Sequence, residues 1–283
     1  MVTPILEGFL LHYSTKHKNL QMMNTMNDLN EIRFLNEPLP VSMADEWFVH
    51  GTANHFWVRH RNELIRKHFG NLIHDANEVG EIGCGSGLVL SYLSKTLCRR
   101  IDGFELNLNA LNLCPRIDGS LYIYDVLQRQ PSYLEKYDLL MTMDVLEHIE
   151  NEQEFLCAVR DHITPQGYLL VGVPMRQHLY SAYDRADGHY RRYEQEYLKS
   201  VIEASGFNII DVLQWGHAYL PLLLLRKFIL GNRVTGDQAI KQGFAISLLM
   251  NKLLGMLKHL DCIPYFGITG SSSIILAKKK LNP

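Results

Sequence analysis

The 283-residue sequence has few cysteines and no long hydrophobic run. Its five cysteines are odd in number and scattered, and no CxxC pair occurs. This pattern argues against a disulfide framework or a structural zinc site, and it is typical of a reducing compartment. The longest apolar run, residues 218–225, is eight residues long and contains Pro221, so it is too short to span a bilayer. Glu7 interrupts the apolar stretch at residues 5–11 and no basic region precedes it, so we expect no signal peptide and a cytoplasmic protein.

An excess of charge of one sign is also missing. The chain has 28 lysines and arginines against 30 aspartates and glutamates, a net charge of −2. This balance gives no argument for nucleic acid or an anionic membrane as a partner of the whole protein. We therefore expect no DNA partner, and RNA is disfavoured because the core has no strong basic cluster. With 47% hydrophobic residues, the chain can form one large domain or one domain with an elaboration.

The first 215 residues divide into an arm and a core. Residues 1–45 are rich in Asn and Met with weak periodicity, and we expect a helical or loosely ordered arm. Residues 46–215 begin with a helix through HFWVRHRNELIRKHF and then alternate β-like runs with helical segments. The expected strands are 78–82, 101–105, 121–124, 137–143, 167–173 and 208–214. The expected helices are near 87–98, 107–114, 151–163 and 194–204. Alternation of this kind predicts an α/β fold with a parallel sheet.

The last part of the chain predicts a helical insertion before a seventh strand. Residues 216–268 contain YLPLLLLRKFIL, and residues 269–283 hold SSSIILAKKK, a strand with a basic tail. Apolar residues at helical spacing in the insertion are Ile246, Leu249, Met250, Leu253, Leu254 and Leu257. Their stripe is typical of a core or dimer contact. Basic residues lie beside it at Arg226, Lys227, Lys252 and Lys258, so a membrane-surface helix or an apolar acceptor stays open as an alternative. The oligomeric state also stays open.

The stretch EIGCGSG, residues 81–87, follows an expected strand and precedes an expected helix, as a nucleotide-binding turn does. A dinucleotide fingerprint requires a third glycine where this chain has Leu88. A phosphate-binding P-loop requires Lys and then Ser or Thr after the last glycine, and Leu88 and Val89 stand there. The loop therefore predicts a ligand other than a dinucleotide or a nucleoside triphosphate.

Three carboxylates indicate what that ligand is. Glu81 precedes the first glycine by two residues, where it would repel a phosphate and attract an ammonium group. Glu105 ends the next expected strand and can accept hydrogen bonds from ribose hydroxyls. Asp125 follows the third strand, where it can accept a hydrogen bond from an adenine amino group. Ammonium, ribose and adenine together describe S-adenosylmethionine.

With these motifs in place, the sequence resembles class I S-adenosylmethionine-dependent methyltransferases of the ubiquinone-biosynthesis and small-molecule O-methyltransferase kind. The matching segments, over about residues 46–215, are EIGCGSG, IDGFELN, YDVLQ, YDLLMTMDVLEHIEN, PQGYLLVGVP and GHYRRYEQEYLKSVIEASGF. The resemblance implies a Rossmann-like, seven-stranded, mostly parallel sheet with helices on both faces. It also implies cofactor contacts at Glu81, Gly83, Cys84, Gly85, Gly87, Glu105, Leu106, Asp125, Val126 and Asp144. By position, residues 216–268 would cap the acceptor pocket.

For the chemistry we expect Asp144, His148 and His189 to act on the acceptor, which we take to be a small molecule methylated at oxygen. Histidines suit the role of base because their pKa values lie near neutral, and His178 is a further candidate. The segment DGHYRRY lies where the family has its acceptor-side loop, so His189 is the leading base or clamp. Its helpers would be Arg191, Arg192 and Tyr193. An N-terminal lid helix would bring Phe56 and Trp57 over the cofactor.

The sequence leaves the role of a metal ion and several competing functions open. Some relatives place a divalent metal ion on a carboxylate and Glu-His set, here Asp144, Glu147 and His148, with His189 as fourth ligand. The competing interpretation is that Glu147 and His148 only cap and orient the next helix, and we expect no metal. The chain could also be an RNA 2′-O-methyltransferase, an enzyme with a lipid or quinone acceptor, or a non-catalytic S-adenosylmethionine-binding protein. A nicotinamide oxidoreductase is the weakest hypothesis, because Leu88 breaks its fingerprint.

Overall fold

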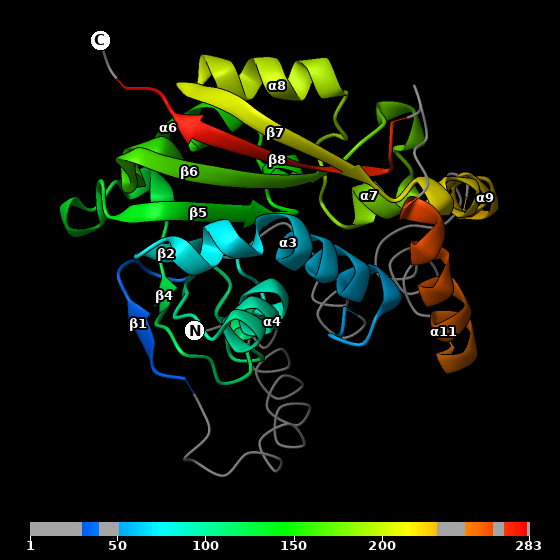
Figure 1. The fold of residues 1–283 in the computed structure, drawn as a ribbon, viewed down its shortest axis with the longest axis horizontal. Coiled ribbons are helices and arrows are strands. Elements are labelled where there is room, and N and C mark those ends of the chain that lie inside the picture. Colours follow the sequence, from blue (N-terminus) through cyan, green and yellow to red (C-terminus); the bar gives the residue numbers. More distant parts are fainter. Residues whose placement is uncertain (1–29, 40–50, 231–246, 263–268, 282–283) are drawn as a thin grey trace, which may run out of the picture.

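The computed structural model describes residues 30–39, 51–230, 247–262 and 269–281. They form one eight-stranded sheet with the order β1-β4-β3-β2-β5-β6-β8-β7 (Figure 1). The strands are β1 (Ile32–Phe34), β2 (Val79–Ile82), β3 (Asp102–Glu105), β4 (Leu121–Ile123), β5 (Tyr137–Met143), β6 (Ile163–Pro174), β7 (Phe207–Trp215) and β8 (Ser272–Lys279). The α-helices are α3 (Phe56–Asp75), α4 (Leu88–Leu97), α5 (Leu108–Leu111), α6 (Glu152–His162), α7 (Ala182–Ala186), α8 (Gln195–Ala204), α9 (Leu220–Leu230) and α11 (Leu248–Met256). Short 3₁₀ helices include η1 (Val126–Gln128), η3 (Leu146–His148), η5 (His217–Tyr219) and η6 (Leu257–Cys262).

The sheet confirms the predicted α/β class. From β1 to β6 all neighbouring strands are parallel, whereas β8 runs antiparallel to both β6 and β7. The glycine loop follows β2, next to β5, where the strand order reverses direction. Ligands of open parallel sheets bind outside the carboxyl ends of the strands at such a point.

One strand was missed by the sequence analysis, so the expected seven strands are corrected to eight. It is β1, which lies within the segment expected to be a helical or loosely ordered arm. Its three residues pair in parallel with β4, with Ile32 opposite Leu121 and Phe34 opposite Ile123. A strand this short at a sheet edge has too few residues for alternation to be recognised, and Phe34 is exposed.

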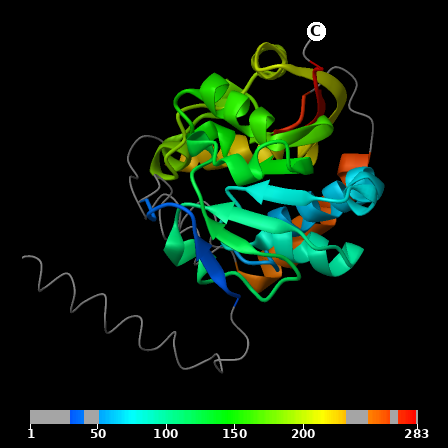
Figure 2. The same ribbon diagram turned by 90° about the vertical axis from the view of Figure 1, so that its left-hand side faces the viewer.

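Helices cover both faces of the sheet, as Figure 2 shows. One core cluster packs α6 and α8 against one face, and a second packs α3 and α4 against the other. The central strands are apolar on both sides for this reason, and Leu139, Leu140 and Met141 of β5 are fully buried.

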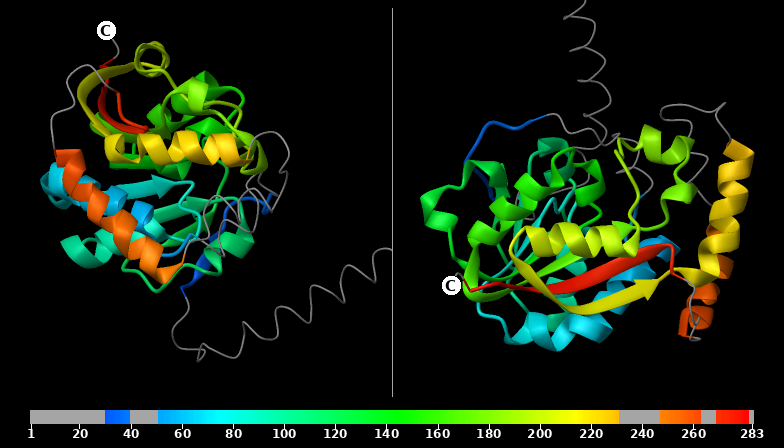
Figure 3. Two further views of the ribbon diagram at one scale, coloured as in Figure 1. Left: turned by 90° about the vertical axis from the view of Figure 1, so that its right-hand side faces the viewer. Right: turned by 90° about the horizontal axis from the view of Figure 1, so that it is seen from above.

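The described part of residues 216–268 is helical, and Figure 3 places α9 and α11 at the same end of the sheet. Asn251 of α11 is tied to the start of α3, because its Oδ1 accepts from the Phe56 backbone N–H at 2.7 Å. The Lys258 ammonium lies 2.8 Å from Glu63 of α3. Ile246 of the predicted stripe lies outside the described residues, and Leu249 and Leu253 are exposed.

The division of the chain into the four segments 1–45, 46–215, 216–268 and 269–283 stays a prediction. No described helix has the length and apolar character that a membrane crossing requires.

Candidate functional site

The loop after β2 turns sharply because three of its glycines have positive φ: +70° at Gly83, +54° at Gly85 and +71° at Gly87. A Cβ atom on Gly83 would lie 2.4 Å from Val145, and one on Gly87 would lie 2.2 Å from the Cys114 sulfur. Glycine is the residue that fits both the backbone conformation and the space. The loop therefore presents bare backbone at the carboxyl end of the sheet.

This loop lines a cavity of about 500 Å³. The cavity reaches from the loop along the ends of β5 and β6 to helices α3, α9 and α11. It brings together most of the predicted methionine-end, catalytic and lid residues: Glu81, Gly83, Cys84, Gly85, Asp144, His148, His189, Phe56 and Trp57. Polar groups that could act on an acceptor and a bare backbone that could hold a cofactor thus share one enclosed space.

The other predicted cofactor residues do not line this cavity: Gly87, Glu105, Leu106, Asp125 and Val126. Glu105 is nearly buried, and its carboxylate accepts hydrogen bonds from the backbone N–H groups of Gly85 at 2.8 Å and Leu106 at 2.8 Å. It thereby fastens the glycine loop to the end of β3. Asp125 caps η1 by accepting from the Leu127 N–H at 3.0 Å. The ribose and adenine roles of these residues stay predictions.

The segment after β1 lies against these same positions. The Asn36 side chain accepts from the Asp125 N–H at 2.9 Å, and the Leu39 N–H donates to the Leu106 carbonyl at 3.1 Å. No signal in the sequence predicted this contact, because nothing in the composition of residues 30–39 pairs them with either strand end.

Glu81 is 2% exposed, and its Oε2 has no hydrogen-bond partner among the described residues. Burial raises the pKa of this carboxyl group to about 8, although the nearby positive charge of Arg61 lowers it. A buried carboxylate oxygen with no partner on the wall of a cavity fits a ligand that carries hydrogen-bond donors and positive charge.

Arg61 of α3 and Asp144 form an ion pair on the cavity wall. Asp144 follows β5 with φ +56°, an unusual backbone conformation that Asp tolerates better than most residues. Arg61 is buried, and its Nε has no hydrogen-bond partner among the described residues. The sequence analysis did not single out Arg61. The sequence did contain one signal for it: Arg61 is a basic residue on the helix face that otherwise packs on the sheet.

Glu147, His148 and His189 gather opposite this pair, with ligand atoms within 4.8 Å of one another. The two imidazole rings are perpendicular, with centroids 4.7 Å apart. Burial, and then the nearby charge of Asp144, raise the pKa of Glu147 to about 8. Burial, and then the positive charge of His189, lower the pKa of His148 to about 4. Within the described chain, Glu147 Oε2 and His148 Nδ1 have no hydrogen-bond partner.

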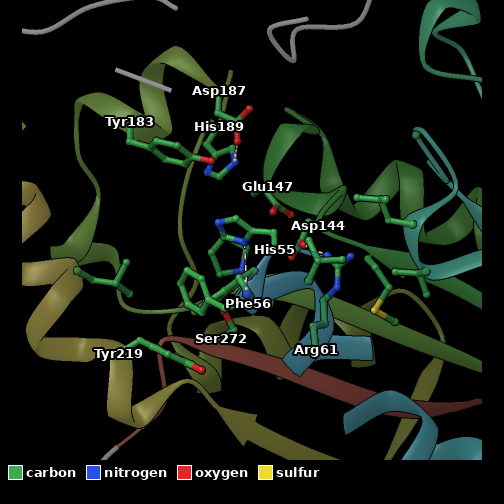
Figure 4. A pocket seen from close by; sticks show the side chains of 18 of the residues that line it. His55, Phe56, Arg61, Asp144, Glu147, Tyr183, Asp187, His189, Tyr219 and Ser272 are labelled. Atoms are coloured by element: carbon green, nitrogen blue, oxygen red, sulfur yellow. Dashed lines mark hydrogen bonds and ion pairs between the residues drawn. The ribbon is translucent and has the colours of Figure 1, made fainter. Parts of the chain in front are cut away.

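His189 is held between two carboxylates. Its Nδ1 lies 3.2 Å from Asp184 and its Nε2 lies 3.3 Å from Asp187. Burial alone would lower the pKa of His189, but the hydrogen bonds to Asp184 and Asp187 outweigh it and raise the pKa to about 10. His189 is therefore a cation at neutral pH, a state that suits a clamp and not a base. In Figure 4, Glu147 lies between the His189–Asp187 pair and the Arg61–Asp144 pair.

The proposed helpers of His189 lie in different places. Arg192 lines the cavity and donates through Nε to Asp184 at 2.6 Å. Arg191 pairs with Glu152, and the Tyr193 hydroxyl lies in the core, donating to the Leu146 carbonyl at 3.1 Å. His178 is exposed and does not line the cavity.

Phe56 and Trp57 line the cavity and also pack against the insertion. The Trp57 ring centroid lies 5.5 Å from that of Tyr219, and the Phe56 centroid lies 5.2 Å from the same ring. Both aromatic residues thus line the cavity and pack against the insertion at the same time.

Comparison with known proteins agrees with this geometry. Residues 53–212 match the family model described as a methyltransferase domain. Ubiquinone biosynthesis O-methyltransferase of Rickettsia typhi is 26% identical over 123 residues, which are 42% of this chain and 48% of that protein. The chain thus spans about half the length of the curated relatives it matches.

Solved structures show the same fold. An S-adenosylmethionine-dependent methyltransferase from Thermotoga maritima is 17% identical, with a TM-score of 0.53 over 83% of this chain and 98% of that one. Phosphoethanolamine N-methyltransferase 2 of Haemonchus contortus, in complex with S-adenosylmethionine, is 15% identical, with a TM-score of 0.52 over 78% of this chain and 52% of that one. The family match contains the glycine loop and the polar cluster but ends before α9.

Proposed function

This chain belongs to the methyltransferase-domain family as a class I S-adenosylmethionine-dependent methyltransferase, and from that premise we propose that it methylates a small-molecule acceptor at an oxygen atom. One observation carries the proposal: a single cavity joins the glycine loop to the cluster of Asp144, Glu147, His148 and His189. The loop holds the cofactor, and the cluster acts on the acceptor.

The residues present fit the methionine end of the cofactor. S-adenosylmethionine supplies a methyl group on a sulfonium and carries an ammonium and a carboxylate. The buried Glu81 oxygen that lacks a partner suits the ammonium group, and an ammonium beside it would favour its charged form. Arg61 suits the carboxylate, since it is a cation that lines the same cavity and its Nε has no hydrogen-bond partner among the described residues. The proposed ribose contacts remain Glu105 and Leu106, and the proposed adenine contacts remain Asp125 and Val126.

The protein's own contribution is to align the acceptor, exclude water and accept its proton. His148 is the candidate to accept a proton, because it is neutral and its Nδ1 has no partner among the described residues, although a pKa of about 4 makes it a weak base in the free enzyme. His189 serves as a clamp, and its positive charge helps to keep His148 neutral. A neutral imidazole at the acceptor can take the proton that a hydroxyl loses on methylation, which is consistent with oxygen as the methylated atom. The O-methyltransferase relatives from Rickettsia support the same choice.

Substitution of His148 tests this assignment. Labelled S-adenosylmethionine is first used to find the acceptor among small-molecule, lipid and RNA fractions. His148→Ala should then lower turnover by about 10²–10⁴-fold, the usual contribution of a general base, with cofactor affinity unchanged. His178→Ala, a substitution of an exposed histidine outside the cavity, is the matched control and should retain wild-type turnover. Wild-type turnover in His148→Ala would exclude it as the base.

A second candidate is methyl transfer assisted by a divalent metal ion, and the spacing of Glu147, His148 and His189 favours it. Carboxylate and imidazole donors are suitable ligands for Zn²⁺ and Mn²⁺. The ion pairs of His189 with Asp184 and Asp187 oppose it, because a metal ion would have to displace one of them. Treatment with a chelator, followed by removal of the chelator and any ion it has bound, distinguishes the two proposals. Full activity after this treatment supports the metal-free enzyme. Loss of activity that Mg²⁺, Mn²⁺ or Zn²⁺ restores supports the metal-assisted reaction.

A further inference from the structure

One arginine on the cavity wall has no carboxylate partner among the described residues. Three arginines line the cavity, namely Arg61, Arg192 and Arg226. Arg61 pairs with Asp144, and Arg192 pairs with Asp184. Arg226 of α9 forms no ion pair within the described part of the chain, and its buried Nε has no hydrogen-bond partner there.

The Arg226 guanidinium is instead stacked on an aromatic ring. Its central carbon lies 4.2 Å from the centre of the Tyr183 ring on α7. A cation–π contact restricts the position of the guanidinium and provides no acceptor for its N–H groups. Arg226 is only partly exposed, so a cation without a carboxylate partner among the described residues points to a ligand that supplies negative charge.

The nearest carboxylates are already engaged with other cations. Asp184 accepts from Arg192 and lies 3.2 Å from His189, and it also caps α7. Asp187 lies 3.3 Å from His189. Neither forms an ion pair with Arg226, so its positive charge stays uncompensated by direct contact with the described residues. Tyr183, Asp187 and His189 lie on one side of the pocket in Figure 4.

The walls next to Arg226 are apolar. Leu222, Leu223 and Leu225 of α9 line the cavity, and so do Met250 and Leu254 of α11. Both helices lie outside residues 53–212, the part that matches the family model. The residues that surround Arg226 on α9 and α11 therefore lie outside the segment that this chain shares with the family model.

We propose that the methyl acceptor carries an anionic group, a carboxylate or a phosphate, that Arg226 binds, on an apolar body that contacts α9 and α11. The inference rests on the proposed function, since it assigns the charge of that acceptor. Arg226 then selects acceptors that carry a negative charge, and the leucines of α9 and α11 select acceptors with an apolar body.

The test is calorimetry on the full chain saturated with S-adenosylhomocysteine, titrated with decanoate, decyl phosphate and decan-1-ol. These probes share one hydrocarbon and differ in the charge of the headgroup. One or both anions should bind roughly tenfold or more tightly than the alcohol, the usual gain from a charge-assisted hydrogen bond. Arg226→Gln should remove that preference and leave alcohol binding unchanged. Lys252→Gln, which removes an exposed cation from α11 outside the cavity, is the matched control and should keep the preference.

Each outcome separates the inference from the proposed function. The S-adenosylhomocysteine titration comes first, and its failure in the wild-type chain would refute the proposed function and the inference with it. If that ligand binds but the anions bind no better than the alcohol, or fail to bind, the inference is overturned and the proposed function stands. Equal anion binding by Arg226→Gln would also overturn it. The stronger of the two anions identifies the headgroup as carboxylate or phosphate.

Discussion

Glu81 shows how much one buried side chain can determine. Its carboxyl group lies in a protein interior, and burial raises its pKa from an ordinary value of 4.5 to about 8. Above pH 4.5 the folded protein therefore binds more protons at this position than the unfolded chain does. Its contribution must destabilise the free enzyme increasingly as the pH rises to about 8, and then level off.

Glu81→Gln removes this titration and gives a pH prediction for the free enzyme. The free energy of unfolding of the variant should exceed that of the wild type by an amount that grows between pH 4.5 and 8, reaching on the order of a few kcal/mol. Chemical denaturation across that range measures the difference. Glu78→Gln, at an exposed carboxylate just before β2, should give a curve parallel to wild type. A parallel curve for Glu81→Gln would show that the carboxyl group titrates normally.

At the scale of single residues, the sequence indicated most of the candidate site. Glu81, Asp144, His148 and His189 all line the cavity. Glu81 lies near the end of β2, Asp144 and His148 follow β5, and His189 lies on the loop after α7. Their protonation states could not be predicted, because they depend on burial and on pairing across the fold. Asp184 is five residues from His189 in sequence, yet only the tertiary arrangement shows that it makes His189 a cation.

At the scale of elements, one carboxylate joins the insertion to the core. Asp261 of η6 lies 2.9 Å from the His60 Nε2 of α3 and accepts from the Gly216 N–H at 2.7 Å and the Ala218 N–H at 3.0 Å. Burial acts to raise the pKa of Asp261, but the His60 hydrogen bond and these N–H groups outweigh it and lower the pKa overall. Asp261 therefore holds η6 against α3 and the start of η5.

Asp261→Asn should weaken this junction. Weakening a buried acceptor that serves several donors typically costs about 1–3 kcal/mol, so the free energy of unfolding should fall by an amount of that order. Since the pKa of Asp261 is lowered in the folded state, its stabilising effect is present above its unfolded value and is lost as the pH falls. Denaturant titration at neutral pH checks the loss. Glu196→Gln, at a carboxylate 86% exposed, should change stability by less than about 0.5 kcal/mol; an equally small effect at Asp261 would contradict the account.

At this scale the sequence predicted strands and helices well where both faces are buried. The strand expected at 137–143 coincides with β5, in which residues 139–143 are all buried. The strand expected at 167–173 is longer, since β6 begins at Ile163 directly after α6. Thr164, Pro165 and Gln166 obscured that extension, because none of them is a typical residue of a buried strand and they lie where the strand is partly exposed.

At the scale of the whole molecule, the alternation of strands and helices predicted a mostly parallel sheet, and the sheet order confirms the class. The sequence analysis expected the insertion beside the acceptor pocket from its place in the chain, but it could not predict the contacts that hold the insertion there. Its helices are joined to the core through long-range contacts, such as the Phe56 N–H donating to Asn251 Oδ1, that no local pattern encodes. Apolar residues of α9 and α11 line the cavity beside these contacts.

The central claim is that the cavity beside the glycine loop holds S-adenosylmethionine. Calorimetric titration of the purified chain with S-adenosylmethionine, S-adenosylhomocysteine and NADH tests it most directly. We predict binding of both adenosyl ligands with dissociation constants on the order of micromolar, no binding of NADH, and affinity roughly tenfold or more lower in Glu81→Gln. Absence of binding by both adenosyl ligands, or tighter binding of NADH, would contradict the account.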